Sequence, residues 1–339
     1  MKIIITGYNT SNQNVAGGVQ LRVKRIYREL SQRNDIIVDY FCPMTSDLHN
    51  CDILHIFKLE PEFLNLVLCA KKLGVKVVLS SIVNMIGGNV IWLKKHFLSK
   101  IPLLHSSKEV FNILELVDCI IAETYQEKVF LSKYYGVPNG KIVVIGNGID
   151  RDDYHGNEIF DVIGTTDKYI LQVGRMNENK NIHNVIKALK GLSLHYVCIG
   201  DGDHNNSEYV NRCKALAGED LHFHFLGWVN SDSELLKSAY ANAQVFVVSS
   251  YQETFSLVAL EGAVHGCNMA MTKTLPIHDF HVFDDCWLFD PYDIDDIKDK
   301  IVSAYYTPRT DITKQKVLKT FSWEKIIDEH IDVYKSLVK

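Results

Sequence analysis

The feature that most restricts the fold is a regular alternation of short apolar runs with longer amphipathic stretches along the whole chain. Several runs are apolar at consecutive positions, as in Asp118-Cys119-Ile120-Ile121, which is typical of strands buried on both faces of a parallel sheet. Strands that alternate with helices predict βαβ units with right-handed crossovers, and therefore an α/β fold. The predicted strands are 2–6, 36–41, 53–57, 76–81, 119–123, 142–146, 169–174, 195–200, 222–227, 245–250, 268–272 and 287–289.

The first amphipathic stretch shows how the helices are expected to pack. Its apolar residues recur at helical spacing and predict a core-facing stripe: Val19, Val23, Ile26 and Leu30. Its basic residues are expected on the opposite, polar face: Arg22, Lys24, Arg25 and Arg28.

The alternation is interrupted once, by a polar stretch that follows Asp150 and runs to about Asp167. A new strand then begins at Tyr169, so we expect two similar Rossmann-like domains, 1–160 and 161–320, followed by a terminal segment, 321–339. A chain of 339 residues is long enough for two hydrophobic cores. Two such sheets are expected to face a cleft at the carboxyl ends of their strands, where open α/β folds bind ligands.

Composition excludes several classes of protein. The net charge is −5 and the 36 Lys and Arg residues are dispersed, so we expect no nucleic-acid partner. The eight cysteines form no C-x-x-C pair, which favours free thiols in a reducing compartment and predicts a cytoplasmic protein. No apolar stretch reaches transmembrane length, and the first one is too short for a signal peptide.

The strongest local signal is the segment Ser249-Ser250-Tyr251-Gln252-Glu253-Thr254-Phe255-Ser256-Leu257-Val258-Ala259-Leu260-Glu261. A strand is predicted to end at Ser250 and a helix to begin near Ser256, which leaves free N–H groups at a helix N-terminus, a site suited to a diphosphate. Glu253 in the turn and Glu261 in the helix would accept hydrogen bonds from sugar or ribose hydroxyls. The alternative is that Glu253 caps the helix and Glu261 is a solvated helix residue.

A second signal, Gly174-Arg175-Met176-Asn177-Glu178-Asn179-Lys180, also lies between a predicted strand and a predicted helix. Arg175 and Lys180 can converge on one anion, with a planar fork and a point charge that suit a diphosphate leaving group. The alternative is a charged loop in solvent.

Two weaker signals are glycine turns. Gly17-Gly18 opens a helix and would let the backbone approach a phosphate, although paired glycines are also common in simple turns. Gly200-Asp201-Gly202 lacks the third glycine of a dinucleotide fingerprint. Asp201 and Asp203 form D-x-D, which we interpret as ordinary loop residues, and the histidines have no clear metal-ligand spacing, so we expect no metal.

In this order, the segments resemble retaining glycosyltransferase family 4, whose members have the GT-B fold. The resemblance extends over nearly the whole chain. The matching segments are Asn147-Gly148-Ile149-Asp150 for N-G-[VI]-D, Gly174-Arg175 with Lys180 for G-R-x4-K, Gly200 with Gly202 for G-x-G, Leu226-Gly227-Trp228-Val229 for L-G-x-V, and Glu253 to Glu261 for E-x-F-G-L-x-x-x-E. Phe321-Ser322-Trp323-Glu324 resembles the start of the last helix, which in this fold crosses back onto the first domain.

The resemblance implies a metal-independent enzyme without a cofactor that transfers a sugar, with retention, from a nucleotide-diphosphate donor to a carbohydrate or lipid-linked acceptor. Arg175 and Lys180 would hold the diphosphate and Glu253 the donor sugar. The other implied donor contacts are the N–H groups of Phe255, Ser256 and Leu257, the loop of Gly17 and Gly18, Glu261 at the ribose, and Gly200, Gly202, Trp228 and Val229 at the base.

One departure affects the mechanism. Many family members carry a histidine in the turn after the fourth strand, whereas this chain has Ser80-Ser81-Ile82-Val83-Asn84 there, so no general base is assigned. A nucleotide-sugar epimerase and a catalytically degenerate nucleotide-sugar binder remain alternative functions.

A basic and aromatic segment also allows two interpretations. The segment Ile91-Trp92-Leu93-Lys94-Lys95-His96-Phe97-Leu98-Ser99-Lys100 fits either a helix packed on the first domain or a helix on an anionic membrane surface, at the inner face of the plasma membrane.

Overall fold

The computed structural model describes residues 1–7, 18–93, 105–202 and 207–338. They form two compact units, one made of residues 1–148 and 323–339 and the other of residues 149–322. The expected domain boundary at 160 therefore falls inside the second unit. The polar stretch around it contains a short helix, α6 (Glu158–Ile163).

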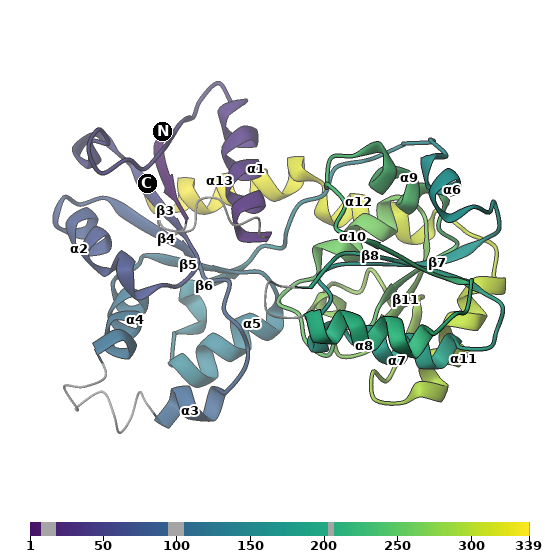
Figure 1. The fold of residues 1–339 in the computed structure, drawn as a ribbon. Helices are drawn as coiled ribbons and strands as arrows, with labels where there is room; N and C mark the ends of the chain where they lie inside the picture. The colour runs from purple at the N-terminus through teal and green to yellow at the C-terminus, as the bar shows by residue number, and fades with distance from the viewer. Residues whose placement is uncertain (8–17, 94–104, 203–206, 339) are drawn as a thin grey trace. The chain divides into compact units, whose positions relative to one another are not determined.

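The first unit is built on a six-stranded sheet in the order β2-β1-β3-β4-β5-β6, in which every neighbouring pair is parallel (Figure 1). Its strands are β1 (Lys2–Thr6), β2 (Ile37–Tyr40), β3 (Ile53–Phe57), β4 (Lys76–Ser80), β5 (Cys119–Ala122) and β6 (Ile142–Val144). Its helices are α1 (Gly18–Ser31), α2 (Leu64–Lys72), α3 (Gly88–Leu93), α4 (His105–Leu116), α5 (Tyr125–Phe130) and α13 (Trp323–Val338). Short 3-10 or π turns cover Leu48–Asn50, Pro61–Phe63, Leu131–Tyr135 and Asn139–Lys141.

The second unit repeats this plan with the strand order β12-β11-β10-β7-β8-β9, again all parallel. Its strands are β7 (Tyr169–Val173), β8 (His195–Ile199), β9 (Phe223–Gly227), β10 (Val245–Val248), β11 (Asn268–Thr272) and β12 (Trp287–Phe289). Besides α6, its helices are α7 (Ile182–Leu189), α8 (Ser207–Ala217), α9 (Glu234–Asn242), α10 (Leu257–Val264), α11 (Ile294–Tyr306) and α12 (Ile312–Phe321). Two 3-10 turns cover Glu178–Lys180 and Pro276–Phe280.

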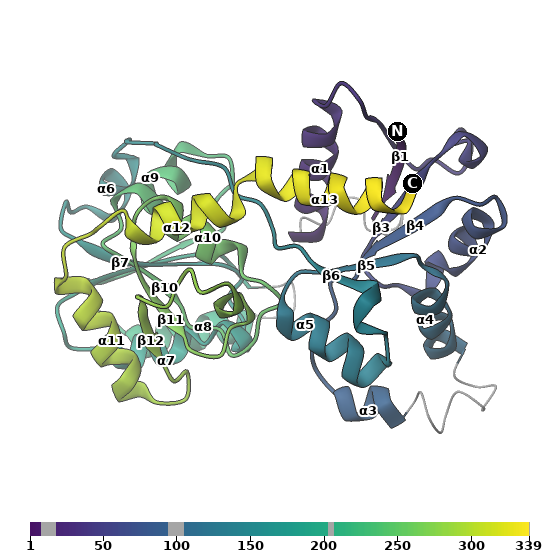
Figure 2. The same cartoon turned by 180° about the vertical axis from the view of Figure 1, so that it is seen from behind.

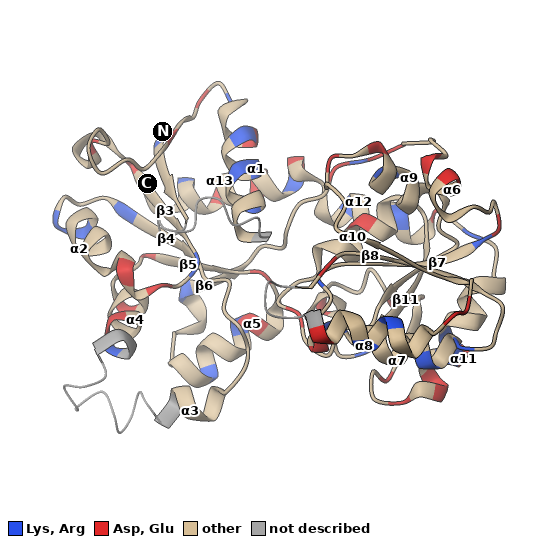
Figure 3. Ribbon diagram, viewed as in Figure 1, with Lys and Arg blue, Asp and Glu red and all other residues tan. Residues whose placement is uncertain are grey.

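The central strands are buried at every position, as expected for sheets with helices on both faces. Helix α13 packs beside α1 in the first unit, and both views of the ribbon show this pair (Figure 2). The N–H of Ile149 donates to the carbonyl of Phe321, 2.7 Å away, where the chain enters and leaves the second unit. Basic and acidic residues both occur on the helices of each unit (Figure 3).

Helix α1 corrects one expectation. Val23, Ile26 and Leu30 are buried as predicted, but Arg22 is also buried, with 2% of its surface exposed. Its guanidinium forms an ion pair with the carboxylate of Glu123, which follows β5. The prediction of a solvent-facing Arg22 is wrong because a buried arginine with a carboxylate partner has the same sequence spacing as a polar-face arginine.

The cysteines agree with the expectation of free thiols. All eight are unpaired, and most are buried.

Candidate functional site

The carboxyl ends of β7, β8 and β9 carry three loops that are joined by backbone hydrogen bonds. These bonds run from Gly174 N to Ile199 O (2.9 Å), from Met176 N to Asp201 O (2.9 Å) and from Gly200 N to Gly227 O (2.7 Å). The Gly200–Gly202 turn and the Gly174–Lys180 loop, recognised separately in the sequence, therefore lie together at one edge of the sheet of the second unit.

The close packing of these two loops requires glycine at position 200. Its φ is 139°, a conformation that side chains rarely allow, and a Cβ there would lie 1.9 Å from the carbonyl oxygen of Gly174. Gly202 follows, and its N–H donates to the side chain of Asp201 at 2.7 Å. The close approach of two loops is thus the structural role of Gly200, while its predicted contact with a nucleotide base remains a prediction.

A fourth loop, after β10, brings Glu253 to Lys180. Lys180 Nζ lies 2.5 Å from Glu253 Oε1, although the two residues are 73 positions apart in the sequence. Their side chains are 20% and 15% exposed. Ser250 Oγ donates to the same carboxylate oxygen at 2.7 Å. Arg175 is exposed in the same loop as Lys180, so the residues predicted to hold the diphosphate and the donor sugar come from two neighbouring loops.

Helix α10 begins directly after this loop. Ser256 is its N-terminal cap residue and adopts a left-handed conformation, with φ 88° and ψ 74°. The family pattern has glycine at this position, which fits a backbone that other residues adopt with strain. Phe255 is buried, and its ring packs edge-on against that of Phe321, with 5.5 Å between the ring centroids. This contact holds the chain just before the first turn of α10. Leu257 is the first helical residue.

Glu261 lies within α10 and is partly exposed. Tyr240 of α9 donates a hydrogen bond from its hydroxyl to Glu261 Oε2 at 2.6 Å. Burial raises the pKa of the Glu261 carboxyl above its usual value. A contact between Glu261 and a ribose stays a prediction, and Tyr240 is a partner that the sequence pattern did not indicate.

Trp228 and Val229 follow β9 at the same edge of the sheet. Trp228 is 71% exposed, and the preceding Gly227 turns the chain with φ 67°. An exposed aromatic ring beside glycine turns can stack on a nucleotide base, as predicted for this position.

The predicted phosphate-facing loop of the first unit is described only in part. Gly18 is the first residue of α1, whereas Gly17 lies outside the described residues.

The turn after β4, where the expected histidine is missing, is held by a buried carboxylate. Glu127 Oε1 accepts hydrogen bonds from Ser81 Oγ (2.8 Å) and Val83 N (2.9 Å), and Oε2 accepts one from Glu123 N (2.5 Å). Burial, with the nearby charge of Glu123, raises the pKa of Glu127 to about 7. Between the two braced residues, Ile82 has φ 45°, a strained value for a β-branched residue. Sequence reasoning missed Glu127.

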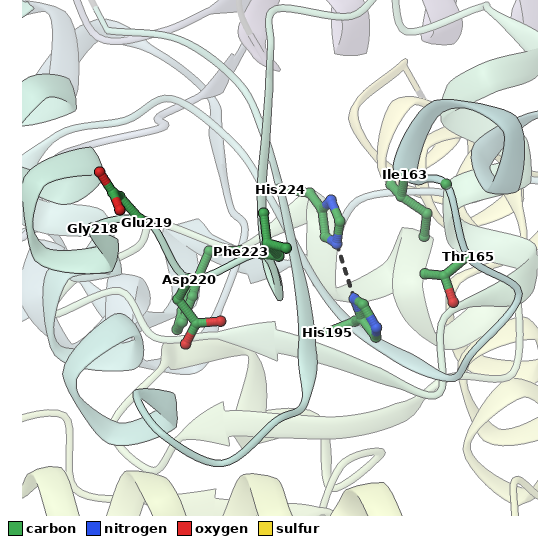
Figure 4. A pocket seen from close by; sticks show the side chains of 10 residues that line it. Ile163, Thr165, His195, Gly218, Glu219, Asp220, Phe223 and His224 are labelled. Atoms are coloured by element: carbon green, nitrogen blue, oxygen red, sulfur yellow. Dashed lines mark hydrogen bonds between the residues drawn. The ribbon is translucent and has the colours of Figure 1, made fainter.

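A pocket in the second unit lies away from these loops, at the amino ends of β8 and β9 (Figure 4). His195 Nδ1 and His224 Nε2 are 3.0 Å apart in its wall. Burial lowers the pKa of both rings. In the described part of the chain, no group of three or more His, Cys, Asp or Glu is arranged to hold a metal ion.

Part of the chain is similar in sequence to known glycosyltransferases. Residues 157–316 match the model of the family described as glycosyl transferases group 1. An uncharacterised glycosyltransferase, MJ1607 of Methanocaldococcus jannaschii, is 30% identical over 221 residues, which are 59% of this chain and 55% of that protein. The processive diacylglycerol alpha-glucosyltransferase of Acholeplasma laidlawii is 27% identical over 190 residues, 54% of each chain. The match thus spans about half the length of these relatives.

Solved structures match over almost the entire chain. Anabaena Alr3699/HepE in complex with UDP has a TM-score of 0.77 at 15% identity, covering 99% of this chain and 100% of that one. The same protein in complex with UDP-glucose has a TM-score of 0.74 at 16% identity, with the same coverage. Sucrose-phosphate synthase from Thermosynechococcus elongatus has a TM-score of 0.73 at 18% identity, covering 99% and 98%. The chain therefore has the GT-B fold, and most of its second unit carries the sequence pattern of the group 1 glycosyl transferases.

Proposed function

We propose that this protein is a glycosyltransferase that uses a nucleotide-diphosphate sugar and transfers its sugar, with retention, to a carbohydrate or lipid-linked acceptor. The observation that carries the proposal is the ion pair of Lys180 and Glu253, which joins the loop that also carries Arg175 to the loop that precedes α10. The family match to residues 157–316 supports the same assignment, as do related folds described in complex with UDP and UDP-glucose.

The chemistry follows from where charge develops. In the transfer, the bond between the anomeric carbon and the phosphate oxygen breaks, and its electron pair stays on the nucleotide diphosphate. Arg175, Lys180 and the free N–H groups at the start of α10 would stabilise this negative charge, with no metal required. Glu253 would accept hydrogen bonds from the donor sugar. The acceptor hydroxyl forms the new bond to the anomeric carbon, and its proton leaves to a base that we do not assign.

A binding screen tests the donor class. A ligand that binds only the folded protein at about 100 times its Kd stabilises it by about 2.7 kcal/mol, so the correct nucleotide should stand out in a thermal-shift comparison of UDP, GDP and ADP. We expect one of them to raise the Tm, and Lys180→Ala to abolish the rise. If none of the three binds in calorimetric titration, the proposal fails.

Product analysis separates the alternatives. Incubation with the matching nucleotide sugar should release nucleoside diphosphate slowly by hydrolysis, and Glu253→Ala or Arg175→Ala should abolish the release. An epimerase would instead convert the nucleotide sugar to its isomer without releasing nucleotide. Binding without either product would indicate a catalytically degenerate nucleotide-sugar binder.

Contact with a membrane is a separate proposal. Helix α3 ends at Leu93, and the basic residues of the segment, Lys94, Lys95 and Lys100, lie outside the described residues. None of the helices in the described ranges is both long and apolar enough to cross a bilayer. Flotation with anionic liposomes, repeated after these three charges are removed, tests the idea of a cytoplasmic protein that binds the membrane surface. Unchanged flotation, or none by the parent protein, would refute the role of this segment.

A further inference from the structure

Asn179 joins the two loops that carry Lys180 and Glu253. Its carbonyl oxygen accepts a hydrogen bond from Tyr251 N at 2.8 Å. Its side-chain amide then pairs with the backbone of the next residue: Asn179 Nδ2 donates to Gln252 O at 2.8 Å, and Asn179 Oδ1 accepts from Gln252 N at 3.1 Å. Three hydrogen bonds from one residue thus imitate the pairing of two strands, beyond the point where β7 and β10 have ended.

The bridge lies next to both members of the Lys180–Glu253 ion pair in the sequence. Asn179 immediately precedes Lys180, and Gln252 immediately precedes Glu253. The bridge therefore fixes the backbone one residue away from each member of the Lys180–Glu253 ion pair. Lys180 is held from the other side too, because its carbonyl accepts hydrogen bonds from Ser249 Oγ (2.7 Å) and Gln172 Nε2 (3.1 Å).

Only an amide of this length can make the side-chain part of the bridge. The side chain of asparagine donates and accepts at once, and both functions are used on the two backbone groups of Gln252. Aspartate would keep the acceptor but place a carboxylate oxygen against the carbonyl of Gln252. Alanine would remove both bonds and leave only the backbone contact with Tyr251.

We propose that Asn179 is a positioning residue that holds Lys180 and Glu253 in register, so that Lys180 meets the diphosphate of the donor while Glu253 meets its sugar. This inference rests on the proposed function, since it concerns the same site. It assigns to an exposed loop asparagine a role in diphosphate recognition that acts through Lys180, without contact between Asn179 and the ligand.

The test compares UDP with UMP, because only the diphosphate offers the second phosphoryl group; GDP with GMP and ADP with AMP are titrated in parallel. The parent protein is expected to prefer the diphosphate. Loss of two hydrogen bonds at the bridge should weaken diphosphate binding about tenfold in Asn179→Ala, with monophosphate binding changed less than about twofold. Asn179→Gln should lose the preference in the same way without a change of charge, because its longer side chain displaces the amide from the two backbone groups of Gln252.

A double-mutant cycle separates positioning from general destabilisation. If Asn179 acts through Lys180, Asn179→Ala should have almost no further effect on diphosphate affinity in a Lys180→Ala background. Asn242→Ala is the matched control. The side-chain amide of Asn242, at the end of α9, also joins segments of the second unit, since it donates hydrogen bonds to the carbonyls of Gly156 and Ser238. It does not belong to the loops that carry Lys180 and Glu253. We expect this control to lower the Tm and to keep the preference for the diphosphate.

The outcomes distinguish failure of the proposed function from failure of the positioning role. If the parent protein binds none of UDP, GDP and ADP, the proposed function itself fails. If the parent prefers the diphosphate and both Asn179 variants keep that preference, the positioning role is refuted. Additive effects of Asn179→Ala and Lys180→Ala would refute it as well. Should Asn179→Ala not fold, Asn179→Gln gives the same decision.

Discussion

At the scale of single residues, the ion pair between Lys180 and Glu253 sets a competition. The charge that would attract a diphosphate is already matched by a carboxylate 2.5 Å away. We therefore expect Glu253→Gln to bind UDP, or whichever nucleoside diphosphate the parent prefers, about threefold to tenfold more tightly, since a partly buried pair of this kind contributes about 1 kcal/mol. The same change should lower the rate of sugar release, because the amide replaces the carboxylate that would hold the sugar. Calorimetric titration and a hydrolysis assay measure the two effects.

The control for this prediction is a neighbouring carboxylate in the same loop. Glu178 forms its ion pair with Arg212, 2.6 Å away, and not with Lys180. Glu178→Gln removes the same charge, so equal tightening in both variants would show that the effect comes from the net charge of the loop and not from release of Lys180.

A second prediction concerns Gly148, and it gives a packing reason for the glycine of the N-G-I-D segment. A Cβ at Gly148 would lie 2.2 Å from the indole of Trp323, the first residue of α13. Gly148→Ala should therefore destabilise the first unit by about 1–3 kcal/mol through overpacking. Gly140→Ala is the matched control, because among the described residues no atom beyond its chain neighbours lies within 4 Å of the added Cβ. Urea denaturation of both variants checks the prediction, and equal midpoints would contradict it.

At the scale of elements, the strands could be predicted and the bridges between loops could not. Every predicted strand is present, within a few residues at its ends, because strands buried on both faces leave apolar runs in the sequence. Helix α6 was missed, because it lies within a polar stretch and its six residues are too few to show a helical period. The buried pair of Arg22 and Glu123 spans 101 positions, and the bridge from Asn179 to Gln252 spans 73. Such contacts depend on the order of strands in the sheet, which local patterns do not contain.

The loops of the candidate site were predictable to the same extent, whereas the roles of their residues remain predictions. Glycines and charges that follow buried strands identified the loops around Lys180, Gly200 and Glu253, because the carboxyl ends of parallel strands meet at one edge. Glu127 could not be identified in this way. Its carboxylate acts on the turn of Ser81 and Val83, in another element, and its position in a helix resembles that of any solvated glutamate.

The N-terminus of α10 contains a residue whose replacement should stabilise the second unit. Ser256 has φ 88°, and its hydroxyl is buried without a hydrogen-bond partner among the described residues. Replacement by glycine removes both costs, and even after the greater flexibility of glycine in the unfolded chain we expect a gain of about 1 kcal/mol. The Tm of the second unit should rise by about 2–4 °C in Ser256→Gly. The Tm should rise less in Ser256→Ala, because this variant keeps the strained backbone. A lower Tm for the glycine variant than for the alanine variant would contradict this account.

At the scale of the whole molecule, the two units have separate hydrophobic cores, one on each sheet. We therefore expect their unfolding to be resolved as two calorimetric transitions rather than one. Their responses to pH should differ, because the first unit buries two histidines in its core. His55 lies between Tyr334 and Ser80, 2.7 and 2.9 Å from their hydroxyl oxygens, and His330 of α13 is fully buried nearby.

Burial lowers the pKa of both rings, that of His330 to about 3, with a further contribution from the charge of Arg22. In the unfolded chain a histidine titrates at about 6.5, so below that pH the unfolded state binds more protons than the folded state, and stability falls as pH falls. Glu127, with its raised pKa, works in the opposite direction. The contribution of one histidine is therefore best isolated as a difference between two proteins.

His330→Phe provides that difference. It keeps an aromatic ring in the core and removes one titrating group. Between about pH 7.5 and pH 5.5 the first unit of the parent protein should lose about 1.4 kcal/mol more stability than that of the variant, which is the cost of one histidine held neutral over this interval. The transition of the second unit should keep its pH dependence, because His330 belongs to the first unit. Equal pH dependence of parent and variant would mean that His330 accepts a proton in the folded state. Equal changes in both transitions would mean that the two units unfold together.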